Sequence, residues 1–254
     1  MARGYWTLQC LKYGHNQSFQ RTLAAMRPTP LNSFVEPPLG AIMWFSLAIL
    51  LIAILSGSTA TIVGFGIGSL LTPLLSVRFG TAIAVAAVSI PHASATALRC
   101  WRLRAEIDRR VLLRFGLLSA AGGLSGALLY AQLSSPILTR VLGSLLLLTA
   151  AAQLTGWSAR WQPKGTLVAL LGLCSGFFGG IAGNQGGLRT AALTAFSLSP
   201  SAFVATATAT GLLVDVARTP IYLWRAGSHL TDLAMPIGIA TFGVLIGTVF
   251  GELS

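Results

Sequence analysis

Long, largely apolar blocks alternate with short polar or basic segments along this chain. Blocks close to the roughly 20 apolar residues that a membrane-spanning helix needs occur at 42–61, 111–133 and 137–156. The whole pattern predicts long helices at 41–62, 81–101, 111–132, 137–156, 166–182, 200–224 and 231–252, with short helices that end near Arg78 and Phe196. We therefore expect an all-α, polytopic membrane protein.

Two glycine-rich segments interrupt the apolar blocks at matching places. They are GSTATIVGFGIGSLLTPLL at 57–75 and GFFGGIAGNQGGLRTAALTAF at 176–196. One shift of 119 residues, the distance from 64 to 183, pairs Gly57 with Gly176, Gly64 with Gly183, Gly68 with Gly187, Ser89 with Thr208 and Arg99 with Arg218. Broken helices at corresponding positions in two halves are typical of secondary transporters, in which the breaks lie near the bilayer midplane and flank the substrate.

The repeat predicts how the chain is divided. We expect a first transmembrane repeat at 40–156, a linker at 157–165 and a second repeat at 166–254. Five crossings in each repeat, an odd number, would invert the second repeat relative to the first. A shift of 121 pairs Gly122 and Gly126 with Gly243 and Gly247, which puts the counterpart of the 137–156 helix beyond Ser254. The last helix of the second repeat is therefore expected to be absent.

Composition agrees with a membrane protein. Charged residues make up 9% of the chain and the mean hydropathy is +0.75, whereas soluble domains contain about 25% charged residues. The net charge of +11 comes largely from short loops, above all 99–114. Such clustering is typical of cytoplasmic loops and of contact with lipid head groups, so no nucleic-acid partner is expected.

Residues 1–39 are polar and are predicted to be a disordered extension. The cysteines and histidines are scattered, so no metal site is expected.

The two breaks are candidate anion-binding elements. Non-helical backbone survives in a membrane only where protein or water covers it, and a short helix that starts after a break directs its free amides into the cavity. The candidate residues at the breaks are Gly64, Gly66, Gly68, Thr72, Gly183, Asn184, Gln185, Gly186, Gly187 and Thr190. For each glycine the alternative interpretation is close helix packing.

Charged residues inside apolar blocks form a second group of candidates. Arg189, Asp215 and Arg218 lie in segments otherwise suited to the membrane, where a charge needs a partner or a polar cavity. Asp215 and Arg218 are three residues apart and can pair on one helix face. They are either a structural ion pair or part of the substrate site, with an arginine that attracts an anion.

Several strings resemble the TauE/SafE family of membrane permeases, sometimes described as sulfite exporters. They are GFGIGSLLTPLL, GTAIAVAAVS and GNQGGLRTAALTAFSLSPSAFVATATATGLLVDVARTPIYL, and the resemblance covers about 40–252. It implies a multi-pass permease of the plasma membrane that moves small anions, chiefly sulfite and organosulfur or sulfonate anions. The family's first break is usually richer in glycine than Gly64-Phe65-Gly66-Ile67-Gly68.

Two other functions stay open at this point. An intramembrane enzyme acting on lipid-linked phosphate would need acid–base groups, and Glu36, Glu106 and Glu252 all lie at the edges of apolar blocks. We therefore predict neither enzyme activity nor a cofactor. A non-transporting assembly or regulatory subunit is the other alternative, because of the expected missing helix. The expected partners are a small anion and the bilayer, and a homo-oligomer is compatible with the sequence.

Overall fold

A computed structural model describes residues 39–156, 163, 165–184 and 186–252. Residues 1–42 and 43–254 are two separate units, and the fold described below is that of residues 43–252. The predicted disordered extension and most of the predicted linker fall outside the described residues, so those predictions stay untested.

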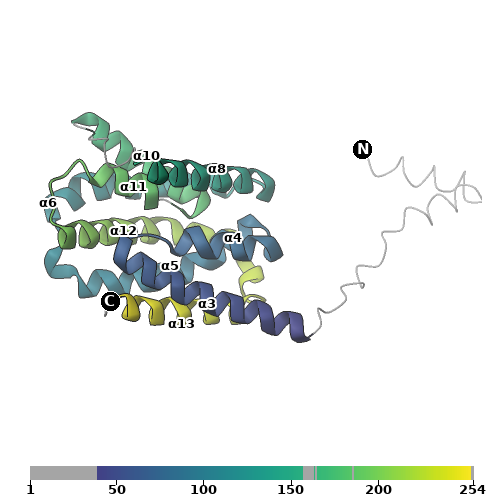
Figure 1. Ribbon diagram of the computed structural model, residues 1–254. Helices are drawn as coiled ribbons and strands as arrows, with labels where there is room; N and C mark the ends of the chain where they lie inside the picture. The colour runs from purple at the N-terminus through teal and green to yellow at the C-terminus, as the bar shows by residue number, and fades with distance from the viewer. Residues whose placement is uncertain (1–38, 157–162, 164, 185, 253–254) are drawn as a thin grey trace, which may run out of the picture. The chain divides into compact units, whose positions relative to one another are not determined.

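The described chain is built of helices (Figure 1), as the sequence predicts. The main helices are α3 (Leu39–Val63), α4 (Ile67–Phe79), α5 (Thr81–Arg102), α7 (Leu117–Tyr130), α8 (Ser135–Leu154), α10 (Thr166–Ala182), α11 (Gly186–Leu193), α12 (Pro200–Ala226) and α13 (Ala234–Gly251). Shorter turns are η1 (Arg104–Glu106), α6 (Arg109–Val111), the π-helix η2 (Leu112–Gly116) and η3 (Gly227–Leu230). Six described helical spans are long and apolar enough to cross a membrane.

The span after the basic loop differs from the single helix predicted at 111–132. Its first part is α6 followed by the π-helical turn η2, and α7 begins only at Leu117. Asp108 caps this start by accepting a hydrogen bond from the Val111 amide, at 2.9 Å. Its own amide donates to Thr206 Oγ1 on α12, at 3.0 Å. The loop is thus attached to the second half of the chain.

Both glycine-rich segments are breaks between helices. Gly64 (φ 84°) and Gly66 (φ 143°) separate α3 from α4, and Gly183 (φ 71°) ends α10 before α11. Residues with a Cβ rarely adopt these positive φ values. Glycine therefore fixes the positions at which the two apolar helices stop.

The remaining glycines of these helices allow close packing between the two halves. A Cβ on Gly122, Gly126, Gly176 or Gly180 would fall on the backbone of the partner helix in the α7–α10 pair. The α3–α13 pair is built in the same way at Gly57, Gly247 and Gly251. Each pair joins one helix from each predicted half, so the sequence repeat corresponds to repeated packing. The inverted relation of the two repeats stays a prediction.

Helices α5 and α12 pack against each other as an antiparallel pair (Figure 1). His92 contacts Asp215, and one turn further along α5 Thr96 lies beside Gly211, one turn earlier on α12. Helices α4 and α13 pack on α5, and α7 packs on α12. The α5–α12 contact thus has helices on both sides, and polar side chains within it are buried.

We predict that Gly176→Ala destabilises the protein, because the new methyl group would overlap the backbone of Ser119 on α7. Overpacking of this kind costs about 1–3 kcal/mol, or about 2–10 °C in the unfolding midpoint. Gly143→Ala on α8 is the control, since nothing lies within 4 Å of its Cβ position. Thermal unfolding in detergent measures both variants. Equal midpoints for the two would contradict the packing role.

Candidate functional site

Four charged side chains are buried inside the helical unit. Arg99 on α5, Arg189 on α11, and Asp215 and Arg218 on α12 are each exposed by 3% or less. Asp215 interacts electrostatically with all three arginines. The other acidic side chains of the described residues, Glu106, Asp108, Asp232 and Glu252, lie outside the candidate membrane spans. Three buried guanidinium groups are therefore within electrostatic reach of one buried carboxylate.

Arg218 is fully engaged by the protein. Its Nε and Nη2 donate to Asp215 Oδ1, at 3.1 and 2.8 Å, and its Nη1 donates to the carbonyl of Gly179. The Tyr222 hydroxyl donates to the carbonyls of Gly179 and Gly180, at 3.1 and 2.5 Å. These carbonyls lie in the last turn of α10, where the Gly179 carbonyl also accepts from the Gly183 amide at 2.9 Å. Arg218 and Tyr222 thus hold the end of α10 at the second break, and Arg218 also pairs with Asp215, as the spacing of the two residues allows.

His92 completes this cluster and was not among the residues predicted from the sequence. Its Nδ1 lies 2.7 Å from Asp215 Oδ2. An ionised carboxylate only accepts hydrogen bonds, so Nδ1 is the donor. No sequence pattern pointed to His92, since its contact with Asp215 depends on how α5 and α12 align. One carboxylate therefore holds both His92 and Arg218.

Arg99 and Arg189 have no such partner. Nε and Nη1 of both side chains are buried without a hydrogen-bond acceptor. Arg189 Nη2 donates to the Gly64 carbonyl at 3.1 Å, and Arg99 Nη2 makes a long contact of 3.4 Å with Thr96 Oγ1. The two guanidinium groups are close enough to repel each other electrostatically. Buried charges of one sign without counterions are costly, so this arrangement is one that a bound anion would stabilise.

The 119-residue shift shows why Arg99 and Arg218 differ. Arg218 has Asp215 three residues before it, whereas Arg99 has Thr96 at the corresponding position. Thr96 offers only a neutral hydroxyl. Glu252 also interacts electrostatically with Arg99, but its carboxylate is bonded to Arg102 near the surface. The first half thus keeps the buried arginine and lacks the buried carboxylate.

The two breaks meet beside this cluster. The Ser69 hydroxyl donates to Asn184 Oδ1 at 3.2 Å, and Arg189 reaches the Gly64 carbonyl. A Cβ on Gly68 would overlap the Gly183 carbonyl, and one on Gly186 would overlap the Phe65 side chain. The two breaks therefore lie next to each other, as expected if both flank one site. At Gly68 and Gly186 the absent side chain makes room for the opposite break.

The other predicted residues lie in different settings. Thr72 is buried, and its hydroxyl has no partner. A Cβ on Gly66 would come within 3.0 Å of Thr59 Oγ1, and Thr190 is partly buried. Gln185 falls outside the described residues. Gly187 faces away from the arginines, because its Cβ position abuts the Thr149 side chain on α8.

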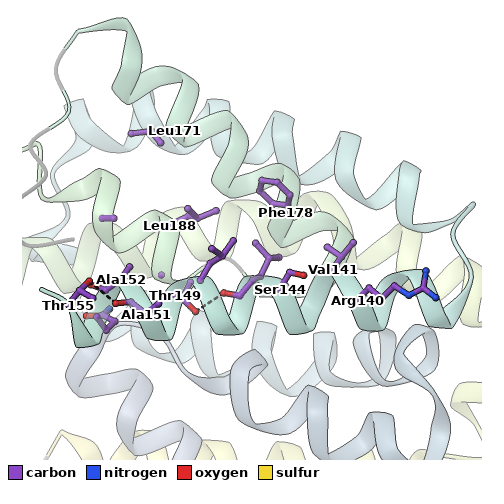
Figure 2. A pocket seen from close by; sticks show the side chains of 15 residues that line it. Arg140, Val141, Ser144, Thr149, Ala151, Ala152, Thr155, Leu171, Phe178 and Leu188 are labelled. Carbon is purple, nitrogen blue, oxygen red and sulfur yellow. Dashed lines mark hydrogen bonds between the residues drawn. The ribbon is translucent and has the colours of Figure 1, made fainter. Parts of the chain in front are cut away.

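Gly187 and Thr149 belong to an apolar groove between α8 and the α10–α11 segment (Figure 2). The groove has a volume of about 730 Å³. Leu145, Phe178 and Leu188 line its wall, and Arg140 lies toward one end of α8. The Thr149 hydroxyl bonds its own helix, donating to the Leu145 carbonyl at 2.8 Å. The residues that line this groove include no buried polar side chain of the kind that an anion requires, so the candidate site is the arginine cluster.

Within the described part of the chain, no group of three His, Cys, Asp or Glu residues could hold a metal ion. The groups that the cluster does present are charged side chains and hydrogen-bond donors. Nε and Nη1 of Arg99 and of Arg189 have no hydrogen-bond acceptor. The Thr208 hydroxyl, one turn before Gly211 on α12, is likewise buried without a partner.

Comparison with known proteins gives one match. The model of the sulfite exporter TauE/SafE family matches residues 49–253, which include every residue of the cluster. No curated protein and no solved structure matches the chain.

We predict a strong energetic coupling between Asp215 and Arg218. Asp215→Asn and Arg218→Met should each destabilise the protein by about 3–5 kcal/mol, because each leaves a buried charge without its partner. The double variant should lose about 1–3 kcal/mol less than the sum of the two. Unfolding in mixed SDS–detergent micelles measures these free energies.

The surface pair of Arg102 and Glu252 provides the control for that cycle. Glu252→Gln should change the free energy of unfolding by about 0–1 kcal/mol, as for other exposed pairs. Additive losses at Asp215 and Arg218 would contradict the pairing.

Proposed function

The chain belongs to the sulfite exporter TauE/SafE family, and from this premise we propose that it is a secondary transporter whose cargo is sulfite or a related organosulfur anion. Members of the family are membrane transporters and not enzymes. With six candidate spans in the described residues, the chain is a multi-pass protein of the plasma membrane. We propose both the identity of the cargo and the residues that bind it.

The observation that carries the proposal is the pair of unpartnered arginines, Arg99 and Arg189. Ionised groups inside membrane spans pair with each other or line the path of a substrate. Arg218 follows the first rule, since Asp215 and the end of α10 occupy its donors. Arg99 and Arg189 have buried donors left over, which supports their assignment as the ligands of a transported anion.

The chemistry of the donors favours an oxyanion. A guanidinium group presents N–H donors in a planar fork that matches two oxygens of one anion. Sulfite and the sulfonate head group both present three oxygens on one sulfur. The two arginines supply donors only, and among the described residues the one buried carboxylate already accepts three hydrogen bonds from His92 and Arg218.

The broken segments complete the proposed site. Arg189 lies in the first turns of α11, a helix of eight residues that follows the second break, and it holds the Gly64 carbonyl of the first break. An anion bound at Arg189 would therefore affect both breaks together. Gly211 is part of the same arrangement, since a Cβ there would come within 2.7 Å of Arg189 Nη1. In this assignment Asp215 and Arg218 position the site, and Arg99 and Arg189 contact the anion.

We predict that Arg99→Gln and Arg189→Gln each weaken anion binding and stabilise the anion-free protein. Each should raise the sulfite concentration for half-maximal uptake about 10- to 100-fold, the loss expected for one charge-assisted hydrogen bond. Each should also raise the unfolding midpoint of the anion-free protein, because an uncompensated buried charge is removed. Counterflow of radiolabelled sulfite in proteoliposomes and thermal unfolding in sulfite-free detergent are the two measurements.

Arg110→Gln is the matched control, since it makes the same change of charge on an exposed arginine and should alter neither quantity. A purely structural role for Arg99 and Arg189 predicts lower stability and unchanged half-saturation. That result would refute the proposed site. Absence of sulfite and sulfonate counterflow in the folded wild-type protein would refute the proposed cargo.

A further inference from the structure

We infer that His92 is the proton-binding residue of this transporter, and that protonation of its imidazole is coupled to anion binding at Arg99 and Arg189. The inference rests on the proposed function, because it concerns the same site. It adds a co-substrate, the proton, and assigns the side chain that would carry it.

His92 lies in the middle of the α5–α12 contact. His92 lies near the middle of α5 (Thr81–Arg102), and Asp215 lies near the middle of α12 (Pro200–Ala226). Their contact therefore joins the two packed helices about halfway along each. The His92 side chain is 12% exposed, whereas that of Asp215 is fully buried. Of the hydrogen-bonded group of His92, Asp215 and Arg218, His92 is thus the side chain with the largest exposed fraction.

The geometry also identifies the atom that binds the proton. His92 Nδ1 carries a hydrogen in both charge states, because it donates to the Asp215 carboxylate. Proton uptake therefore forms an N–H bond at Nε2 and turns the neutral ring into an imidazolium, and release reverses this step. No hydrogen bond in the cluster has to break. Histidine is the side chain that titrates in the physiological range, about pH 5 to 8.

The charged surroundings couple this proton to an anion. Helix α12 presents Asp215 and Arg218 to His92, α5 itself contributes Arg99, and α11 brings Arg189 to Asp215. Of the other helices packed on α5, α13 has no charged residue, and Arg78 near the end of α4 and the exposed Arg140 of α8 are the only charges on those two. The turns η3 and η1 at the ends of α5 carry His229, Arg104 and Glu106, all of them exposed. With neutral His92 the buried groups sum to two positive charges, and protonation makes three.

A bound monoanion offsets the added charge. Protonated His92 therefore strengthens anion binding, and by linkage the anion strengthens proton binding by the same factor. Thr96 connects the two sites, since its hydroxyl oxygen lies 3.4 Å from both His92 Nδ1 and Arg99 Nη2. The loaded carrier thus holds one proton and one anion, which would cross together. The sum of the two gradients then sets the direction of transport.

Isethionate is a suitable probe for the test, because its sulfonate stays a monoanion across the pH range in which histidine titrates. We expect wild-type protein to bind isethionate about 5- to 150-fold more tightly at about pH 5 than at about pH 8. We also expect proton uptake when isethionate is added to weakly buffered protein, followed with a pH indicator. In proteoliposomes an acidic exterior should drive isethionate inward.

The test variant is His92→Gln, which keeps a donor for Asp215 and cannot bind a proton. It should lose the pH dependence of isethionate binding and the accumulation of isethionate driven by a pH gradient. His229→Gln, at the exposed histidine of η3, should behave as wild type. The wild-type proton-uptake measurement tests the inference even if His92→Gln fails to fold.

The possible failures are distinguishable. Wild-type protein that binds and exchanges isethionate or sulfite without proton uptake would overturn the role of His92 and leave the proposed function standing. So would His92→Gln protein with unchanged pH dependence. Wild-type protein that neither binds nor exchanges either anion would overturn the proposed function and, with it, this inference.

Discussion

Everything at the centre of this protein depends on the cost of placing a guanidinium group in a membrane interior. A buried charge there needs an opposite charge or a full set of hydrogen bonds. Three arginines are buried within electrostatic reach of one carboxylate. Arg218 takes that carboxylate together with His92, and Arg99 and Arg189 are left with unused donors. The resulting excess of positive charge is what an anion permease requires of its binding site.

The scaffold follows the sequence repeat, and the site is made where the halves differ. Glycines at corresponding positions build the α3–α13 and α7–α10 pairs. Under the same 119-residue shift, Asp215 corresponds to Thr96, His92 to Gly211 and Arg189 to Leu70. Each difference adds or removes a buried charge or a titratable group. Similar glycine-packed helix pairs thus accompany a set of buried charges that differs between the two halves.

Much of the fold could be predicted from sequence, because bilayer thickness fixes helix length and glycine marks where a helix stops. The breaks at Gly64 and Gly183 were predicted on these grounds, and Arg189 was found because a charge in an apolar block is conspicuous. His92 was missed, since its partner lies 123 residues away and only the packing of α5 on α12 brings them together. Arg99 was identified from the sequence only as the counterpart of Arg218 and as part of the basic segment 99–114. Gly187 was grouped with the break, whereas its missing side chain accommodates α8.

The most direct test of the account is to locate a bound anion. Selenite has the shape and charge of sulfite, and selenium gives an anomalous X-ray signal, so a selenite-soaked crystal would show the position of the anion. We predict one anomalous peak within hydrogen-bond distance of both Arg99 and Arg189. A peak at Arg218, where Asp215 now lies, a peak in the groove beside α8, or peaks only among the surface arginines of the basic loop would refute this anion site.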